Sequence, residues 1–135
     1  MLSEKIEFFI PLEKIPTVTH QEKKITVVNG KPIVYESQKM KNVRLVFEGH
    51  LFSFAPETPL QGPIRLTTKW IWPKKKKSDP DQYKVTKPDT DNLIKAFKDC
   101  MTKVGFWKDD AQVASEITEK FYGNISGIYV KVECL

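Results

Sequence analysis

Two stretches in which apolar residues recur at helical spacing lie on either side of one stretch that alternates, and this order constrains the fold most. The first stretch predicts a helix that Ser37 can cap and that runs to about Ser53. Its apolar stripe would consist of Met40, Val43, Phe47, Leu51 and Phe54. A helix, a strand and a second helix in succession indicate a fold that mixes α and β elements.

The alternating stretch runs from Ile64 to Trp72 and predicts a half-buried strand. One side of this strand is mainly apolar, whereas the other carries Arg65 and Lys69 and is partly basic. From Thr90 the helical spacing returns, and Gly105 is a natural stop for the second helix. The apolar face of that helix would consist of Leu93, Ile94, Phe97, Cys100, Met101 and Val104.

The remaining apolar runs predict strands. Glu4 to Ile10 is a short strand candidate, and Asn29-Gly30 between β-branched runs predicts a tight hairpin. Val113 to Tyr122 and Ile125 to Glu133 predict a closing hairpin that turns around Gly123-Asn124. The expected order is therefore β, hairpin, α, β, α, β, β. We expect an α+β fold in which residues 1–135 form a single domain, with a small mixed sheet and two main helices.

Positive charge is concentrated in one segment of the chain. The formal net charge is +5, and the segment from Arg65 to Lys87 contains eight basic and two acidic residues. Three prolines between residues 73 and 88 predict a mobile connection without regular structure. Such a segment favours a nucleic-acid partner, although a solvated lysine loop is the alternative. The lysines predicted to contact DNA are Lys74, Lys75, Lys76, Lys77, Lys84 and Lys87.

Neither the first residues nor any apolar run has the character of a signal peptide or a membrane span, so we expect no membrane partner. Cys100 and Cys134 do not form a closely spaced pair, which argues against a zinc site. We expect two reduced thiols, with a disulfide between them as the alternative.

The segment from Lys87 to Lys95 holds the first candidate site. Pro88 disfavours helix before it, so the second helix begins at about Thr90, and Asp89 and Asp91 lie on either side of that residue. Capping explains one acid, whereas two form an oxygen pair suited to a hard divalent cation. Lys95 follows Asp91 by four residues and shares its face of the helix, opposite the apolar stripe. Its alternative role is a surface ion pair.

A second acidic pair, Asp109 and Asp110, lies between the second helix and the next strand. Turns favour aspartate, but the position also suits a third metal ligand. A calcium-binding EF-hand loop starting at Asp89 is excluded, because Leu93, Ile94 and Cys100 occupy its fifth, sixth and twelfth positions. A phosphatase with an aspartyl-phosphate would place its acidic pair after a strand, in a larger parallel fold.

Residues 87–113 resemble the RusA-like Holliday junction resolvases. The matching blocks are Lys87-Pro88-Asp89-Thr90-Asp91-Asn92-Leu93-Ile94-Lys95, then Asp99, then Gly105-Phe106-Trp107-Lys108-Asp109-Asp110-Ala111-Gln112-Val113. The resemblance implies a cytoplasmic homodimer that resolves four-way DNA junctions by paired symmetric nicks with Mg²⁺, or Mn²⁺ as a substitute. It implies Asp89, Asp91 and Asp110 as metal ligands and Lys95 as an essential lysine, and it leaves the role of Asp109 open.

The chain departs from the family pattern in two places. Some members carry several arginines immediately before the first acid, whereas here only Lys87 is adjacent and the lysine run lies about ten residues earlier. The N-terminal segment also matches poorly. Two other functions stay open: a nuclease for other branched DNA, and a branched-DNA-binding module without catalysis. Trp70, Trp72 and Trp107 could serve such a module, although tryptophans more often belong to the core.

Overall fold

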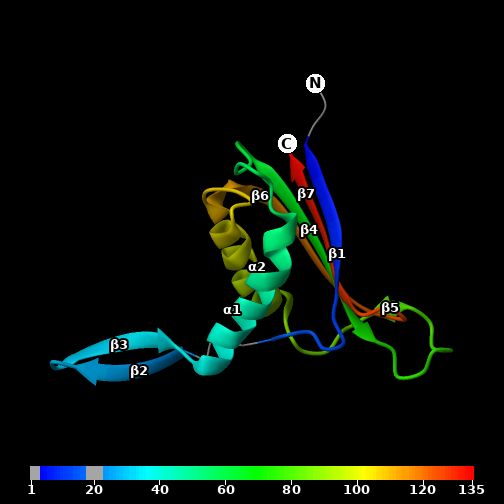
Figure 1. Ribbon diagram of the computed structural model, residues 1–135. Coiled ribbons are helices and arrows are strands. Elements are labelled where there is room, and N and C mark those ends of the chain that lie inside the picture. Colours follow the sequence, from blue (N-terminus) through cyan, green and yellow to red (C-terminus); the bar gives the residue numbers. More distant parts are fainter. Residues whose placement is uncertain (1–3, 18–22) are drawn as a thin grey trace.

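A five-stranded sheet with two helices on one face forms the body of the protein (Figure 1). The computed structural model describes residues 4–17 and 23–135. Its strands are β1 (Lys5–Pro11), β2 (Lys23–Val28), β3 (Lys31–Glu36), β4 (Ile64–Pro73), β5 (Gln82–Tyr83), β6 (Val113–Gly123) and β7 (Gly127–Cys134). Its helices are α1 (Gln38–Leu51) and α2 (Thr90–Val104), with 3-10 turns η2 (Phe52–Phe54) and η3 (Asp110–Gln112). The sheet order is β1-β7-β4-β6-β5, in which only β4 and β6 pair in parallel. The expected α+β fold with a mixed sheet is confirmed.

The core lies between the sheet and the two helices, where the predicted apolar faces meet. Phe47 of α1, Trp70 of β4 and Phe97 of α2 are all buried. The ring centroids of Phe47 and Phe97 lie 5.1 Å apart, and those of Trp70 and Phe97 lie 5.3 Å apart, both in edge-to-face contact. Trp107 is buried as well. Two of the three tryptophans therefore belong to the core and are not available to bind DNA.

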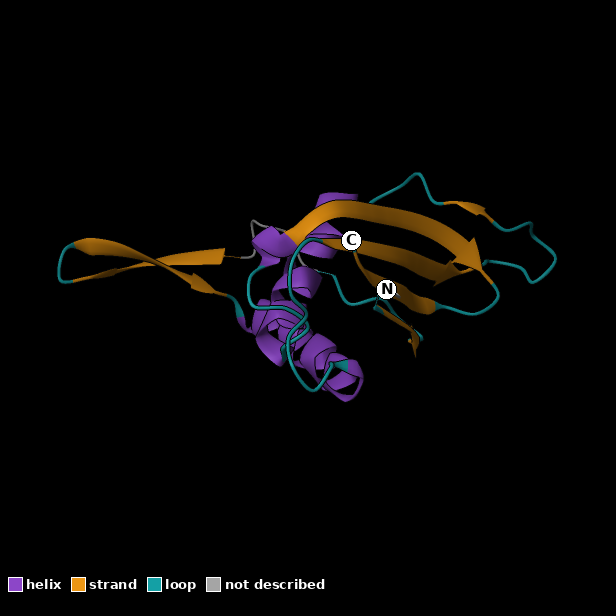
Figure 2. Cartoon of the chain, turned by 90° about the horizontal axis from the view of Figure 1, so that it is seen from above, coloured by secondary structure: helices purple, strands orange, loops and turns teal. Residues whose placement is uncertain are grey.

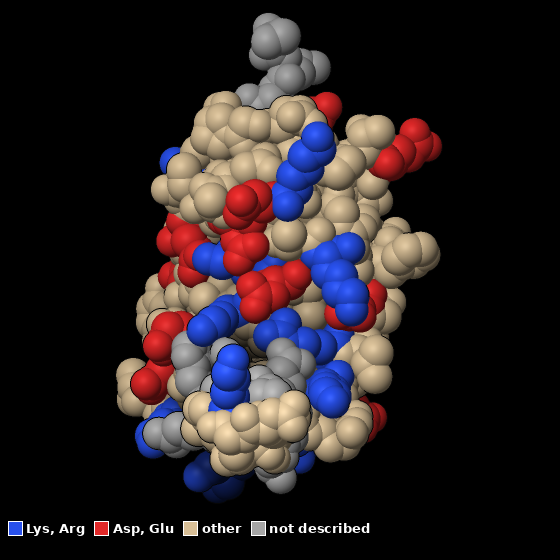
Figure 3. All heavy atoms as spheres, turned by 90° about the vertical axis from the view of Figure 1, so that its left-hand side faces the viewer, with Lys and Arg blue, Asp and Glu red and all other residues tan. Residues whose placement is uncertain are grey.

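The two helices pack side by side in the same direction. Arg44 Nη2 lies 3.4 Å from Asp99 Oδ2, and Lys103 Nζ lies 3.1 Å from Glu48 Oε1, one turn further along both helices. The two ion pairs have the same spacing along both helices, so the helices run in parallel. Seen from the side on which the helices lie, the molecule presents interspersed acidic and basic side chains (Figure 3). Ser37 caps α1 as predicted, because its Oγ accepts a hydrogen bond from the Met40 backbone N–H.

Strands β2 and β3 form an arm that extends away from the sheet and the helices (Figures 1 and 2). The predicted turn is confirmed, since Asn29 and Gly30 both have positive φ, at 52° and 77°. Ile25 and Val27 on β2 are each 69% exposed. The described side chains of the arm therefore contribute nothing to the core.

The predicted closing hairpin of β6 and β7 is wrong. Strand β4 lies between them and pairs in parallel with β6 and antiparallel with β7. The reason is that α2 forms a crossover from β4 to β6, and a crossover of this length makes a parallel pair. Strand β7 then returns along the opposite side of β4. Both strands occur where expected, but their predicted partnership does not.

The prediction of no regular structure between residues 73 and 88 is also wrong. Strand β5 lies in this interval and pairs with β6, with Gln82 opposite Tyr122 and Tyr83 opposite Phe121. A turn precedes it, in which the backbone N–H of Lys76 donates to the side chain of Asp79. Helix α1 also ends slightly earlier than predicted, at Leu51, where the 3-10 turn η2 begins.

Both cysteines carry free thiols, as expected. Burial is the main cause that raises the pKa of the Cys100 thiol to about 11. No helix within residues 4–17 and 23–135 combines the length and the apolar character that crossing a bilayer requires.

Candidate active site

Asp89 and Asp91 stand at the beginning of α2 with both side chains exposed. Asp89 occupies the N-cap position in an extended backbone conformation, but its carboxylate accepts no capping hydrogen bond. Asp91 lies in the first turn. The positive end of the helix dipole favours negative charge at this place. Among the described residues, no hydrogen bond or ion pair engages either carboxylate, so both are available to a ligand.

Lys95 lies one turn further along α2 and is exposed, whereas Leu93, Ile94 and Phe97 on the opposite side are buried. The prediction that Asp91 and Lys95 point away from the core is therefore confirmed. The alternative role for Lys95 was a surface ion pair. No ion pair joins Lys95 to any part of the chain that the structure describes. The first turns of α2 thus present two carboxylates and one ammonium group to solvent.

Lys120 on β6 holds the segment that leads into Asp89. Its Nζ donates hydrogen bonds to the carbonyl oxygens of Thr86 at 2.7 Å and Pro88 at 2.8 Å. Sequence reasoning missed this residue, because a bond to a backbone carbonyl requires no particular residue type at the accepting position. A lone lysine on a strand, 32 residues away from its acceptor, gives no signal in the sequence.

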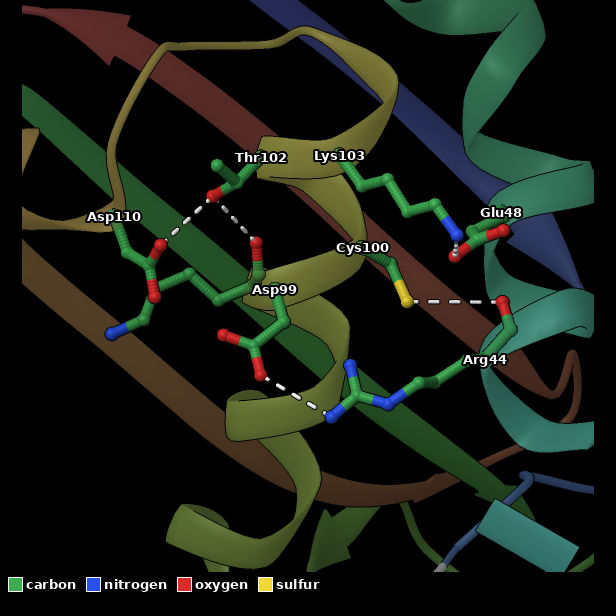
Figure 4. Close-up of polar contacts among 8 residues, drawn as sticks. Arg44, Glu48, Asp99, Cys100, Thr102, Lys103 and Asp110 are labelled. Atoms are coloured by element: carbon green, nitrogen blue, oxygen red, sulfur yellow. Dashed lines mark hydrogen bonds and ion pairs between the residues drawn. The ribbon is translucent and has the colours of Figure 1, made fainter. Parts of the chain in front are cut away.

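Asp110 lies beyond the opposite end of α2, in η3. Thr102 Oγ1 donates a hydrogen bond to Asp110 Oδ1 at 3.0 Å (Figure 4). Trp107 Nε1 donates to Thr102 Oγ1 at 2.7 Å. The carboxyl group of Asp99 lies beside that of Asp110. Partial burial first, and the neighbouring Asp110 carboxyl second, raise the pKa of Asp99, while Arg44 opposes this rise. Asp110 is therefore anchored near a second acid.

Asp109 has a structural role that its neighbour lacks. Its Oδ1 accepts a hydrogen bond from the Ala111 backbone N–H at 2.9 Å, and Gln112 Oε1 accepts one from the Asp109 backbone N–H, which completes a capping box for η3. Gln112 Nε2 also donates to the carbonyl oxygens of Leu60 and Gly62. Together these bonds fix the turn that presents Asp110.

The structure does not bring Asp110 together with Asp89 and Asp91 in one chain. Thr102, to which Asp110 is bonded, follows Asp91 by eleven residues on the same helix, which corresponds to about 16 Å along its axis. Two oxygen ligands of one cation lie at most about 5 Å apart. The described residues accordingly contain no group of three or more His, Cys, Asp or Glu side chains that could hold a metal ion.

The carboxylates at the beginning of α2 are the donors that the chain offers to the predicted cation. Asp89 and Asp91 fit a hard cation, because both offer oxygen atoms that no described group occupies. These two carboxylates supply two of the three predicted ligands. The third predicted ligand would have to come from a surface that one chain does not place beside them.

The six lysines predicted to contact DNA fall into two groups. Lys74 is 8% exposed at its side chain and forms an ion pair of 2.6 Å with Asp81. Lys84 donates to Thr86 and Tyr122 and lies over the ring of Trp72. These two lysines stabilise the segment itself. The exposed lysines of the group are Lys75, Lys76, Lys77 and Lys87.

Comparison with known proteins extends the similarity far beyond the acidic motifs. The family model of endodeoxyribonuclease RusA matches residues 14–133. The crossover junction endodeoxyribonuclease rusA of Lactococcus phage r1t is 34% identical over 111 residues, which cover 81% of this chain and 82% of that protein. The uncharacterized protein YqaN of Bacillus subtilis (strain 168) is 31% identical over 122 residues, which cover 79% of this chain and 82% of that protein.

Proposed function

The chain belongs to the endodeoxyribonuclease RusA family, and from this premise we propose that it is a metal-dependent endonuclease that resolves four-way DNA junctions by paired symmetric nicks. The observation that carries the proposal is the free pair of carboxylates, Asp89 and Asp91, with Lys95 one turn away on the same helical face. A capping role or an ion-pairing role would require hydrogen bonds or ion pairs from these side chains. None exists among the described residues.

Asp89 and Asp91 would hold Mg²⁺, with Mn²⁺ as a substitute, through their carboxylate oxygens. A bound ion of this kind supplies Lewis-acid polarisation of the scissile phosphate and lowers the pKa of a bound water. Lys95 would stabilise the negative charge that develops on the phosphoryl oxygens. The exposed position of all three side chains suits a substrate as large as a DNA branch.

We further propose a homodimer, because a second copy supplies what one chain lacks. If two α2 helices face each other antiparallel across a two-fold axis, Asp110 of the partner subunit approaches Asp89 and Asp91. The same arrangement repeats at the other end of the helix pair. Two symmetric cuts call for two sites related by such an axis. The separation of the acids along α2 supports this arrangement.

The exposed lysines offset the repulsion between the acidic site and DNA. Lys75, Lys76, Lys77 and Lys87 would neutralise backbone phosphates on the arms of the junction. Contacts of this kind position a duplex without reading its sequence. A cytoplasmic location remains part of the proposal.

Two alternatives are separated by one assay. Labelled four-way junction, flap and linear duplex are each incubated with the protein, with and without Mg²⁺. Symmetric nicking of the junction only with Mg²⁺ supports the proposal. Junction binding without nicking would indicate a binding module, and preferred cleavage of the flap would indicate a nuclease for other branched DNA.

The variant Asp91→Asn assigns the activity to the site. Nicking should be lost while the Kd for the junction, measured without metal, stays close to that of the wild-type protein. The reason is that asparagine keeps the shape of the side chain but removes the charge that a cation requires. Asp81→Asn is the matched control, because it removes an exposed carboxylate that pairs with Lys74 outside the site. Persistent nicking by Asp91→Asn would refute the site assignment.

A further inference from the structure

We propose that Lys120 is a positioning residue that holds Asp89 in place for metal binding. The inference rests on the proposed function, because it concerns the same site. It begins from the two hydrogen bonds that Lys120 Nζ donates to the carbonyl oxygens of Thr86 and Pro88, at 2.7 and 2.8 Å. The second of these carbonyls belongs to the peptide bond that joins Pro88 to Asp89.

Lys120 contacts both ends of the segment that carries the chain from β5 to α2. Its backbone carbonyl oxygen accepts a hydrogen bond from the Lys84 backbone N–H at 2.9 Å, and its side chain holds the other end at Pro88. The intervening residues 85–87 are exposed. One residue of β6 therefore contacts this segment both where it leaves β5 and where it reaches α2.

Asp89 depends on this support because its own side chain contributes none. Its carboxylate makes no capping bond, and its neighbour Thr90 is exposed. Hydrogen bonds from an ammonium group to carbonyl oxygens are stronger than those between neutral groups. A misplacement of about 0.5–1 Å is enough to impair a metal or catalytic site. Loss of the Lys120 side chain would free the backbone beside Asp89 to move by such an amount.

The direction of the effect separates positioning from simple electrostatics. If Lys120 acted only through its positive charge, its removal would relieve repulsion and strengthen the binding of a cation. If Lys120 positions Asp89, its removal weakens that binding. Groups that orient metal ligands in this indirect way contribute about 10–100-fold to metal affinity.

The test measures Mn²⁺ binding to the full-length protein without DNA, from the electron paramagnetic resonance signal of the free ion. Lys120→Met should weaken binding about tenfold, and Lys120→Arg should restore most of the affinity. Lys69→Met is the matched control. It removes the same charge from the neighbouring strand β4, where Lys69 lies on the opposite face of the sheet, over the ring of Tyr129. This control should bind Mn²⁺ as the wild-type protein does.

Circular dichroism melting confirms that each variant is folded. If Lys120→Met does not fold, Lys120→Gln replaces it, since glutamine is uncharged and one bond shorter, and it should weaken Mn²⁺ binding in the same direction. Unchanged or tighter binding by the folded variant would overturn the inference while leaving the proposed function intact. A wild-type protein that neither binds Mn²⁺ nor nicks junctions would instead overturn the proposed function.

Discussion

Two adjacent aspartates after α2 have different surroundings, and these surroundings separate their roles. Asp109 accepts a hydrogen bond from the Ala111 backbone and caps η3. Asp110 accepts a hydrogen bond from the Thr102 side chain and lies beside the carboxyl group of Asp99, so it has no capping role. The sequence alone left the choice between them to the family resemblance. The capping role of Asp109 in η3 is compatible with the proposal that Asp110 is the metal ligand.

This difference predicts opposite outcomes for two matched substitutions. Asp110→Asn should lower the rate of junction nicking by about a hundredfold, which corresponds to about 2.7 kcal/mol, because a cation would lose a charged ligand. Asp109→Asn should retain nicking and the melting temperature, since asparagine caps helices as well as aspartate does. Single-turnover cleavage of a labelled junction measures both. Equal losses in the two variants would contradict the assignment.

At the scale of single elements, the sequence predicted the features that depend on residues close together in the chain. The cap at Ser37, the turn at Asn29-Gly30 and the helix stop at Gly105 all depend on neighbours in sequence, and the structure confirms each of them. The pairing of β6 with β4, and not with β7, depends on where α2 carries the chain. Nothing in the residues of β6 itself encodes that path, so the sequence could not reveal it.

In the candidate site, too, the arrangement within one helix could be predicted, whereas the distance between distant residues could not. Helical periodicity placed Asp91 and Lys95 on one exposed face, because both lie on a single rigid element. The distance from Asp91 to Asp110 could not be predicted. A spacing of about twenty residues allows the two carboxylates to be in contact or far apart. They are far apart because α2, which is helical from Thr90 to Val104, lies between them.

The lysine-rich segment should act through its exposed members only. Combined substitution Lys75→Gln, Lys76→Gln and Lys77→Gln should reduce the slope of log Kd for the junction against log salt concentration by up to about 2.7, because each phosphate contact contributes about 0.9. Fluorescence anisotropy without metal measures the slope.

Lys74→Gln is the internal control for this experiment. The Lys74 side chain is already paired with Asp81 and is nearly buried, so its loss should leave the slope almost unchanged. If the triple variant kept the wild-type slope, the segment would be a solvated loop and DNA would bind elsewhere.

At the scale of the whole molecule, the acids of the predicted site lie at opposite ends of one helix. A single chain therefore presents two separate groups of acids: Asp89 and Asp91 at the beginning of α2, and Asp110 beyond its end. In the proposed homodimer, a two-fold axis would combine these two groups of acids into two complete sites. Metal binding, dimer formation and paired cutting then depend on the same arrangement, so a protein that cannot dimerise should not nick.

Mixing two inactive variants tests this central claim most directly. Asp91→Asn and Asp110→Asn should each nick at most at about a hundredth of the wild-type rate when alone, because every shared site then lacks one ligand. In a mixed dimer, one site contains both substitutions and the other contains only native carboxylates. After statistical exchange of subunits, about a quarter of the wild-type nicking rate should return. A mixture as inactive as either variant alone, with exchange verified by mass spectrometry, would contradict the account.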